Sequence, residues 1–349
     1  MFKTYEKYII KSFVQKFMNI SLIFLSLTIV LSILEEISFF KNIDASFLYP
    51  YLLTLLGAPI TLFEIFPFIF LISTQFLFYD LFKKEELNLL KTSGLSNFKV
   101  IKILFFSSMF IGVFTVLLYY NAASKLKFFY TDIKNSFSND NKYLAVVTDN
   151  GLWLKDEVDE SIRIIKANYM KDDYLIDVII NEFDKNFNLE NTIQSKKINI
   201  NQKMWLIEKP TVTKNNISKN IIGEIQLKTN FDKEKINTLF SNISTLNLLE
   251  LFNLKKDYEN LGYSSDEIVI HLLKLLSMPL LYGVLTILSS IIMFNFKRDK
   301  SLFFHIVLGI FMSVVIYYIN FMFSSLGNSG KIPIIASIFF PILFISLIS

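Results

Sequence analysis

One apolar stretch decides the fold class of this chain: residues 49–82, which read YPYLLTLLGAPITLFEIFPFIFLISTQFLFYDLF. The stretch has no Lys or Arg, and it contains Pro59, Glu64 and Pro67. A bilayer with a hydrocarbon core of ~30 Å needs about 20 apolar residues in helical conformation to span it. The stretch therefore predicts a membrane-spanning helix, long enough to tilt, kink or project beyond the bilayer.

The composition of the whole chain points the same way. Of 349 residues, 52% are hydrophobic and 19% are charged, whereas about 25% charged is usual for soluble domains. Residues 124–270 hold 20 of the 35 Lys and Arg and 22 of the 31 Asp and Glu. This excludes a soluble globular enzyme, a disordered protein and a fibrous protein. Cysteine is absent, which excludes disulfides, thiolate metal sites and cysteine nucleophiles.

Six stretches have the length and hydropathy of membrane-spanning helices. They are residues 17–40, 49–82, 103–120, 268–296, 302–323 and 332–348. Lys and Arg favour the cytoplasmic side of short loops, and three basic groups fall on one side of a six-span chain, at residues 3–16, 83–102 and 297–300. We therefore predict both termini in the cytoplasm and residues 124–266 on the opposite side. The net charge of +4 is small, and with basic residues beside apolar spans it gives no reason to expect a nucleic-acid partner.

The exported segment has the pattern of an antiparallel all-β domain. Period-two or β-rich runs recur at residues 143–148, 162–167, 174–183, 193–200 and 204–213, separated by turn residues. Such spacing favours a sandwich or a jelly-roll-like domain over βαβ units. Residues 246–261 change to helical spacing and predict a connector into the fourth span.

The predicted organisation has three parts. Residues 1–123 contain three transmembrane helices with a cytoplasmic coupling helix near residues 84–97. Residues 124–266 form the β-jelly-roll domain with its C-terminal helical connector. Residues 267–349 contain transmembrane helices four to six.

The chain has few groups suited to catalysis or metal binding. His271 and His305 are the only histidines, and neither belongs to a ligand pair, so we favour structural or interfacial roles for both. The run GNSGK at residues 327–331 looks like a phosphate-binding loop. However, Ser325 stands where the motif needs Gly, and Ile332 stands where it needs Ser or Thr. We predict no catalytic residue, no metal site and no nucleotide hydrolysis by this chain.

Acidic groups inside apolar spans are costly and are therefore candidates for function. Glu64, between two prolines, belongs either to a hydrogen-bonded helix break or to a substrate or gating site. Glu36 follows Glu35 and precedes Lys41. It belongs either to a salt-bridged helix end at the membrane interface or to a rim that meets a charged amphiphile.

Residues 84–97, between the second and third spans, predict a short amphipathic helix on the cytoplasmic surface. Its features are leucines that can share a face, a glycine that can end the helix and a serine that can cap the next one: Leu87, Leu90, Leu95, Gly94 and Ser96. The alternatives are a solvated loop and a helix lying on anionic lipid. Because an anionic surface repels the adjacent Glu85 and Glu86, we favour a helix that docks a cytoplasmic protein.

With this segment included, the whole chain resembles the LptF/LptG permease family of the lipopolysaccharide exporter. The family pattern of Glu-Leu, then a small residue, Gly, an aliphatic residue and Ser, is matched at residues 86–87 and 93–96. Further matches are Lys274 with residues 278–280 (MPL), Leu326 and Gly327 with residues 331–333 (KIP), Ala336 and Pro341. Residues 151–156 (GLWLKD) and 34–36 (LEE) are similar to the LptG branch.

The resemblance implies an ABC exporter in the bacterial inner membrane, in which this chain pairs with a sister permease. A separate cytoplasmic ATPase dimer, which holds ATP and magnesium, would bind the coupling helix at Glu86 and drive the extraction of lipopolysaccharide. This chain would bind no cofactor itself. Its exported domain would pass lipopolysaccharide to periplasmic bridge proteins of similar β fold.

Lipopolysaccharide carries acyl chains and phosphates, so its permease needs an apolar cavity with charged groups at the rim. Lys41, Lys274 and Lys331 are the candidate phosphate contacts, because lysine meets phosphate as a point charge. Glu36 and Glu64 are candidates beside them.

Two other functions are weighed against transport. One is a membrane-anchored periplasmic sensor or assembly scaffold without transport activity. The other is an integral-membrane enzyme acting on lipid or glycan, against which the scarcity of histidine and the lack of a nucleophile motif both count.

Overall fold

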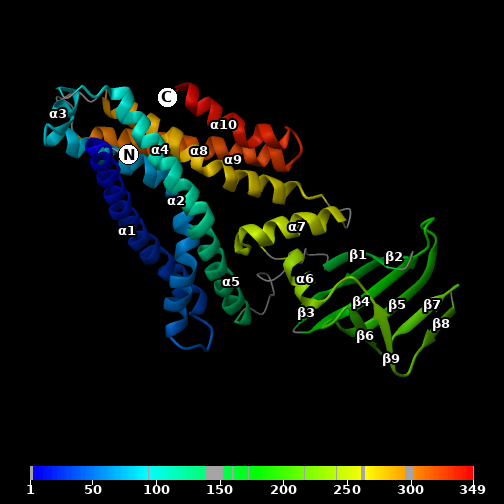
Figure 1. Ribbon diagram of the computed structural model, residues 1–349. Coiled ribbons are helices and arrows are strands. Elements are labelled where there is room, and N and C mark those ends of the chain that lie inside the picture. The colour runs from blue at the N-terminus through cyan, green and yellow to red at the C-terminus, as the bar shows by residue number, and fades with distance from the viewer. Residues whose placement is uncertain are drawn as a thin grey trace. The chain divides into compact units, whose positions relative to one another are not determined.

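The computed structural model describes residues 3–92, 94–137, 152–158, 161–171, 173–215, 217–240, 242–260, 264–294 and 302–348 (Figure 1). The chain forms two compact units. The first, here called the membrane unit, comprises Met1–Tyr130, Leu246–Phe252 and Ser265–Ser349. The second, here called the β unit, comprises Thr131–Thr245 and Asn253–Ser264. The predicted strand at residues 143–148 and the basic group at residues 297–300 lie outside the described residues.

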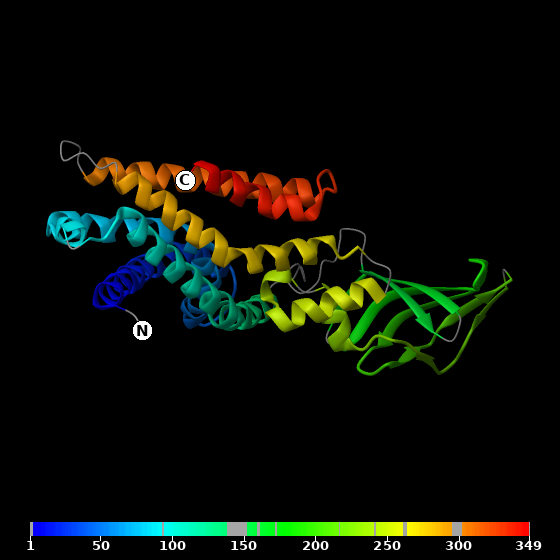
Figure 2. The same cartoon turned by 45° about the horizontal axis from the view of Figure 1, so that its top comes forward.

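The membrane unit is built from long helices. They are α1 (Thr4–Phe40), α2 (Leu48–Lys83), α3 (Glu86–Thr92), α4 (Asn97–Phe114), α8 (Asp266–Phe294), α9 (Leu302–Asn328) and α10 (Ile334–Ile348). Two further helices, α5 (Asn121–Ser136) and α7 (Leu248–Asn260), begin in this unit and end in the β unit. In Figure 2, α9 and α10 run beside each other along α8, and residue contacts join all three helices.

Five helices of the described chain are long and apolar enough to cross a membrane, which confirms a multi-pass helical membrane protein. They cover the first five predicted spans. The sixth predicted span forms an apolar helix too, but α10 has only 15 residues. At 1.5 Å per residue it reaches about 22 Å, which is less than the hydrocarbon core of ~30 Å. A complete sixth crossing therefore stays a prediction.

The helix at the third predicted span is much longer than the apolar run that predicted it. From α4 it continues through a π-helix, Thr115–Tyr120, into α5 and ends at Ser136. Residues after Tyr120 are mostly polar or amphipathic, so hydropathy alone did not reveal them. A π-helix is a rare form that accommodates an extra residue in the turn and is frequent at functional sites.

Small side chains let α4 approach α8 closely. Gly112 has no room for a Cβ atom, which would lie 2.7 Å from the Cα atom of Pro279. At Gly283, a Cβ atom would lie 2.7 Å from the ring of Phe105. One turn before Gly112, the hydroxyl of Ser108 shares a 2.8 Å hydrogen bond with that of Thr286. In lipid, where apolar helices gain little from mutual burial, such close packing and interhelical hydrogen bonds hold helices together.

Aromatic rings fill the space between α1, α2 and α8. Phe70 of α2 lies at the centre, with its ring 4.7 Å from Phe17 of α1 and 4.4 Å from Tyr282 of α8, centroid to centroid. All three side chains are buried. Rings at these separations attract one another beyond their burial, so α2 forms the central packing partner of this unit.

The β unit contains one antiparallel sheet, which forms a half-barrel. Its strands are β1 (Leu152–Val158), β2 (Ser161–Ala167), β3 (Tyr169–Lys171), β4 (Tyr174–Phe183), β5 (Leu189–Asn199), β6 (Met204–Glu208), β7 (Thr211–Lys214), β8 (Ile217–Asn220) and β9 (Glu224–Lys228). The main order is β1-β2-β4-β5-β6-β9; β3 pairs with β4, and β7 joins β5 to β8. The predicted antiparallel β insert is confirmed, while the finer assignment to a jelly roll stays a prediction.

The predicted strands differ from the observed ones in detail. Residues 204–213 form two strands, because the backbone turns at Lys209, which has a φ of 44°, and Pro210 cannot donate a ladder hydrogen bond. The strands β1, β3, β8 and β9 were not predicted. The predicted helical connector is observed as α7, and a further helix, α6 (Lys233–Phe240), precedes it.

Polar contacts tie the first strands of the half-barrel to the chain that follows its last strand. Asp156 of β1 accepts a 2.9 Å hydrogen bond from the side-chain amide of Asn230. Arg163 of β2 donates to the carbonyl of Lys228 at 2.6 Å and pairs with Glu182 of β4 at 2.7 Å. These contacts draw the two ends of the strand order toward each other, which holds the curvature of the sheet.

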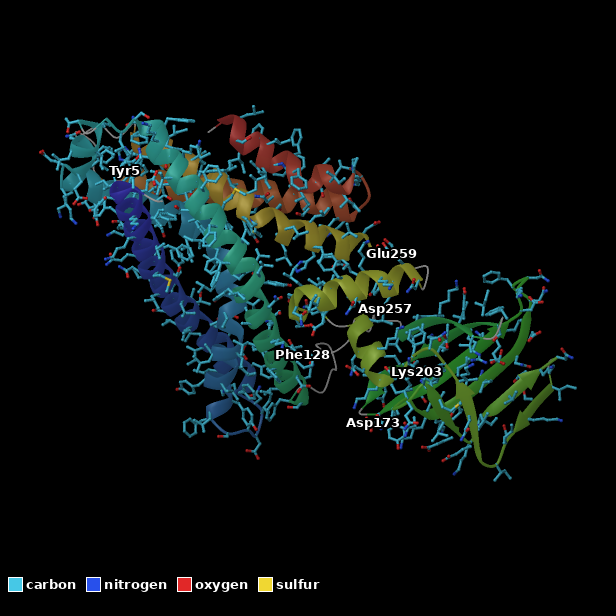
Figure 3. The ribbon with its side chains drawn as sticks, viewed as in Figure 1. Tyr5, Phe128, Asp173, Lys203, Asp257 and Glu259 are labelled. Atoms are coloured by element: carbon cyan, nitrogen blue, oxygen red, sulfur yellow. The ribbon has the colours of Figure 1, made fainter. Side chains whose placement is uncertain are left out.

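At one end of the sheet, helix α6 is anchored by charge and by an indole. Asp173, between β3 and β4, and Lys203, between β5 and β6, mark this end (Figure 3). Lys233 of α6 forms a 2.6 Å ion pair with Asp173. The buried Trp205 donates its indole N–H to the carbonyl of Phe231 at 2.8 Å.

The stability of the β unit should depend on the protonation of Asp156. Burial raises the pKa of this carboxyl above its usual value, and hydrogen bonds from Asn230 and the charge of Arg163 only partly offset the effect. The stability gained from protonation is therefore fully present below the carboxyl's unfolded-state pKa. It is lost as pH rises through the raised folded-state pKa. Asp156→Asn should flatten this pH dependence.

The measurement is urea unfolding of the intact chain in detergent across this pH range, followed by tryptophan fluorescence. Both tryptophans, Trp153 and Trp205, lie in the β unit and report on it alone. Asp177→Asn, an exposed carboxyl on the same sheet, is the matched control and should keep the wild-type pH profile. An unchanged pH profile in the Asp156 variant would contradict the assignment.

Candidate functional site

The segment between α2 and α4 folds as predicted, into a short helix with defined ends. Helix α3 ends at Gly94, which has a φ of +84°, a backbone conformation that favours glycine. The Gly94 N–H donates to the carbonyl of Lys91 at 3.0 Å, and the Leu95 N–H donates to that of Leu90 at 3.1 Å. This pair of bonds is a Schellman motif. The Ser96 hydroxyl then accepts from the Lys99 N–H, which caps α4.

Helix α3 has one buried and one exposed apolar side. Leu87 and Leu95 are buried, and Leu90 is half-buried. Leu89 points the other way, with 64% of its surface exposed. The predicted short helix with a buried apolar side is thus confirmed, and its exposed side carries Leu89 as well as charged residues.

Glu86 lies where α3 meets the start of α1. Its carboxylate accepts a 2.5 Å hydrogen bond from the hydroxyl of Tyr8. About two turns further along α1, Lys16 forms an ion pair with Asp80 of α2. The ammonium of Lys91 lies 5.8 Å from the ring centre of Phe294, at the end of α8. The beginning of α1 and the ends of α2 and α8 therefore gather around α3, in what we call the coupling corner.

A second set of charged residues lies on α1, α2, α5 and α8, and we call it the charged cluster: Glu36, Glu64, Lys127 and Lys274. The positive charges of Lys274 and Lys127 both act on the Glu64 carboxylate. The side chains of Glu64 and Lys274 are exposed, so the chain taken alone leaves them open to a ligand. Two predicted site residues, Glu64 and Lys274, thus lie within electrostatic range of each other although 210 positions separate them in the sequence.

Lys127 joins Glu36 to the same cluster. Its ammonium lies 4.1 Å from the ring centre of Tyr130, whose hydroxyl donates to the Glu36 carboxylate at 2.8 Å. Glu36 is 3% exposed. The ring of Tyr130 packs on Gly57 of α2, where a Cβ atom would come within 3.4 Å. Lys127 was not predicted from the sequence, because it follows the last apolar residue of its span and looks like part of the exported domain.

The π-helix places two consecutive tyrosines against different helices. Tyr119 donates its hydroxyl to the carbonyl of Pro59 in α2 at 3.0 Å. Tyr120 lies 3.0 Å from Nε2 of His271 in α8 and donates to the carbonyl of Leu246. Their rings also contact Phe66 and Phe63, on either side of Glu64. The π-helix therefore connects the helix that carries Glu64 with the helix that carries Lys274.

The remaining predicted contacts lie elsewhere. Lys41 caps the C-terminus of α1, and Lys331 follows α9 after a Schellman motif centred on Gly330, which has a φ of +68°. Both side chains are exposed, and neither forms an ion pair within the described ranges. The structure does not bring them into the charged cluster.

The part of the chain that the structure describes contains no group of three or more His, Asp or Glu side chains placed to hold a metal ion. The ring of His271 is hydrogen-bonded to the hydroxyl of Tyr120. His305 is buried, and its backbone carbonyl accepts a 2.8 Å hydrogen bond from the side-chain amide of Gln75. Both histidines thus take part in helix packing contacts, as favoured from the sequence.

Comparison with protein families gives a match over residues 7–349 to the lipopolysaccharide export system permease LptF/LptG. The chain belongs to the LptF/LptG permease family. This family membership covers both units and assigns the chain to a lipopolysaccharide export system as a permease, with no catalytic family assigned. Comparison with curated proteins gives no match.

Proposed function

We propose that this chain is the LptG-type permease subunit of an ABC exporter that extracts lipopolysaccharide from the bacterial inner membrane. A separate ATPase dimer, carrying ATP and magnesium, drives it, and a sister permease completes the pathway. The observation that carries the proposal is α3, a capped helix that presents Glu86 and Leu89 beside three membrane helices. A permease family without its own nucleotide loop needs such a contact to receive energy from another subunit.

The topology follows from the coupling corner. The hydrogen bond between Tyr8 and Glu86 places the N-terminal end of α1 beside α3, and Lys91 meets the C-terminal end of α8 there. The first two basic segments of the sequence, and the end of the helix that precedes the third, thus meet at one corner, which the rule for Lys and Arg assigns to the cytoplasm. The charged cluster then lies toward the periplasmic ends of α1, α2 and α8.

The charged cluster suits the phosphates of lipopolysaccharide. Lys127 and Lys274 supply the cations, and Glu64 and Glu36 orient them. Lys41 and Lys331 supply further positive charge at helix ends. In this role the half-barrel is this chain's form of the jelly roll, and its edge strand β1 or β9 extends the periplasmic bridge by strand addition.

Removal of both cluster lysines should weaken lipopolysaccharide binding. For Lys127→Gln with Lys274→Gln, we expect binding to the purified complex to weaken about 100-fold or more, because charge-assisted hydrogen bonds contribute roughly 1.5–3 kcal/mol each. Lys99→Gln with Lys125→Gln changes the same total charge at exposed positions outside the cluster and should leave binding within about twofold, which on the same scale is under 1 kcal/mol. Binding is measured by titration of fluorescent lipopolysaccharide, and equal affinities for both double variants would refute this role of the cluster.

The experiment that tests the function is purification of the native complex with a tag on this chain, followed by identification of its subunits and bound lipid. We expect an ABC ATPase, a second LptF/LptG permease and lipopolysaccharide. A chain that purifies without an ATPase or second permease would instead support the sensor or scaffold, and lipid turnover by the chain alone would support an enzyme.

A further inference from the structure

A polar cleft of about 720 Å³ lies in the β unit, across strands β2, β4, β5 and β7. One row of cross-strand neighbours runs along it: Lys166, Ile179, Gln194 and Thr211. Their chain neighbours Ile165, Ile180 and Ile193 are buried on the other face of the sheet. The cleft therefore lies on the face that points away from the apolar interior of the half-barrel.

The cleft is concave because two strands bend at the same place. In β4, Leu175 and Val178 are both buried although regular alternation would place them on opposite faces. Asp177, between them, has a φ of 51°. In β5, Ser195 and Ile198 show the same change of face.

The partners of β5 change at this bend. Strand β5 pairs with β7 before it and with β6 after it. Ser195 fastens the bend, because its hydroxyl donates to the carbonyl of Glu208 at 2.6 Å. The bend beneath the cleft is thus held by the backbone of three strands, and Asn168 and Lys209 line the cleft from the turns that follow β2 and β6.

The cleft carries more positive than negative charge. Four lysines and two carboxylates line it: Lys166, Lys196, Lys197, Lys209, Asp177 and Glu208. Lys197 is held over the ring of Tyr174, at 3.6 Å from its centre, and lies 4.0 Å from Glu208. Asp177 accepts from the amide of Asn168 at 3.2 Å. Lys196 and Lys209 are exposed and form no ion pair with any residue that the structure describes.

We propose that this cleft binds a phosphorylated saccharide. The unpaired ammonium groups of Lys196 and Lys209 match phosphate, while Asn168, Gln194 and Thr211 offer amides and a hydroxyl to sugar hydroxyls. Lys166 lies 5.2 Å from the ring centre of Trp153, which is 49% exposed and available to an apolar sugar face. Acyl chains are excluded, since burying these charges under hydrocarbon is costly.

The proposal rests on the proposed function only for the source of the ligand, the saccharide of the exported lipopolysaccharide. With the saccharide bound in the cleft, the two faces of the β unit have different roles. The interior side is apolar, whereas the cleft holds the anionic head of the same molecule as it crosses the domain.

The test uses the full chain purified in detergent, with any subunits that accompany it, and without ATP. The probe is deacylated lipopolysaccharide saccharide that retains its phosphates, and its binding is measured by calorimetric titration. Lys196→Gln with Lys209→Gln should weaken binding about tenfold, the loss expected for two solvated charge-assisted contacts. Lys214→Gln with Lys219→Gln, which alters the same charge on exposed residues of the neighbouring strands, should retain wild-type affinity. Phosphatase treatment of the probe should reproduce the loss.

Equal affinity of the two double variants would overturn the proposal, and so would undiminished binding of the dephosphorylated probe. A poly-glutamate peptide that binds when the saccharide does not would also overturn it, in favour of an acidic protein. Failure of an ATPase to co-purify, in contrast, refutes the exporter and leaves this binding measurement unchanged.

Discussion

Exchange of Glu86 for lysine is expected to abolish ATP-driven release of lipopolysaccharide while the membrane unit stays folded. Glu86 stands on α3 at the coupling corner, beside the exposed Leu89, and it supplies negative charge where the family resemblance places a basic residue of the ATPase. Losing one partner of a buried charge pair costs about 2–5 kcal/mol, and a lysine adds repulsion. We therefore expect ATPase association to fall more than tenfold, measured by co-purification and by release from proteoliposomes.

Two variants separate the contact with the ATPase from the contact with Tyr8. Tyr8→Phe removes the 2.5 Å hydrogen bond to Glu86 but leaves the carboxylate, so it should cost about 1 kcal/mol of local stability and preserve coupling. Glu85→Lys changes the same charge at the preceding residue and should couple nearly normally. If Tyr8→Phe uncouples as strongly as Glu86→Lys, Glu86 acts by positioning α3 on α1. Survival of both ATPase binding and release in Glu86→Lys would refute the coupling contact itself.

Gly112→Leu is expected to separate α4 from α8 and to destabilise the membrane unit by roughly 3 kcal/mol or more, the upper range for overpacking. Even a Cβ atom at this position would lie 2.7 Å from the backbone of Pro279 and 2.9 Å from the ring of Tyr282. A backbone atom within a helix cannot give way as a side chain can. The neighbouring hydrogen bond between Ser108 and Thr286 should break as the helices part.

The measurement is unfolding in sodium dodecyl sulfate, followed by far-UV circular dichroism. Gly112→Ala should be intermediate, destabilising although alanine favours helix by about 1 kcal/mol. Gly57→Ala is the matched control, because a Cβ atom there meets only the Tyr130 ring at an ordinary 3.4 Å. It should be neutral or stabilising, and an equally mild effect at Gly112 would contradict the close packing of α4 on α8.

Hydropathy located the membrane helices because each long apolar run has no other stable environment. It failed at α5, whose residues are amphipathic and look exported, and it gave no sign of the π-helix, which leaves no mark on apolar spacing. In the β unit, alternation found β2 and β4. It missed β8, whose residues are exposed on both faces.

The candidate sites, too, were predicted from the sequence only in part. The features of this segment are local, so Gly94 predicted the end of α3 and Ser96 the start of α4 directly. Glu64 was noticed because a carboxylate in an apolar run is costly. Its neighbours Lys274 and Lys127 come from distant segments, and only the packing of α2, α5 and α8 shows which charges meet.

The π-helix at Thr115–Tyr120 sets the rotation of α5 about the helix axis relative to α4. Each residue of a regular helix advances the side chains by about 100°, so loss of one residue from α4 would rotate Lys127 and Tyr130 away from Glu64 and Glu36. Loss of one residue within the π-helix would instead return this turn to regular α-helix and keep both side chains near their present orientation. This turn is therefore the place in the long helix where a single-codon deletion should leave the charged cluster aligned.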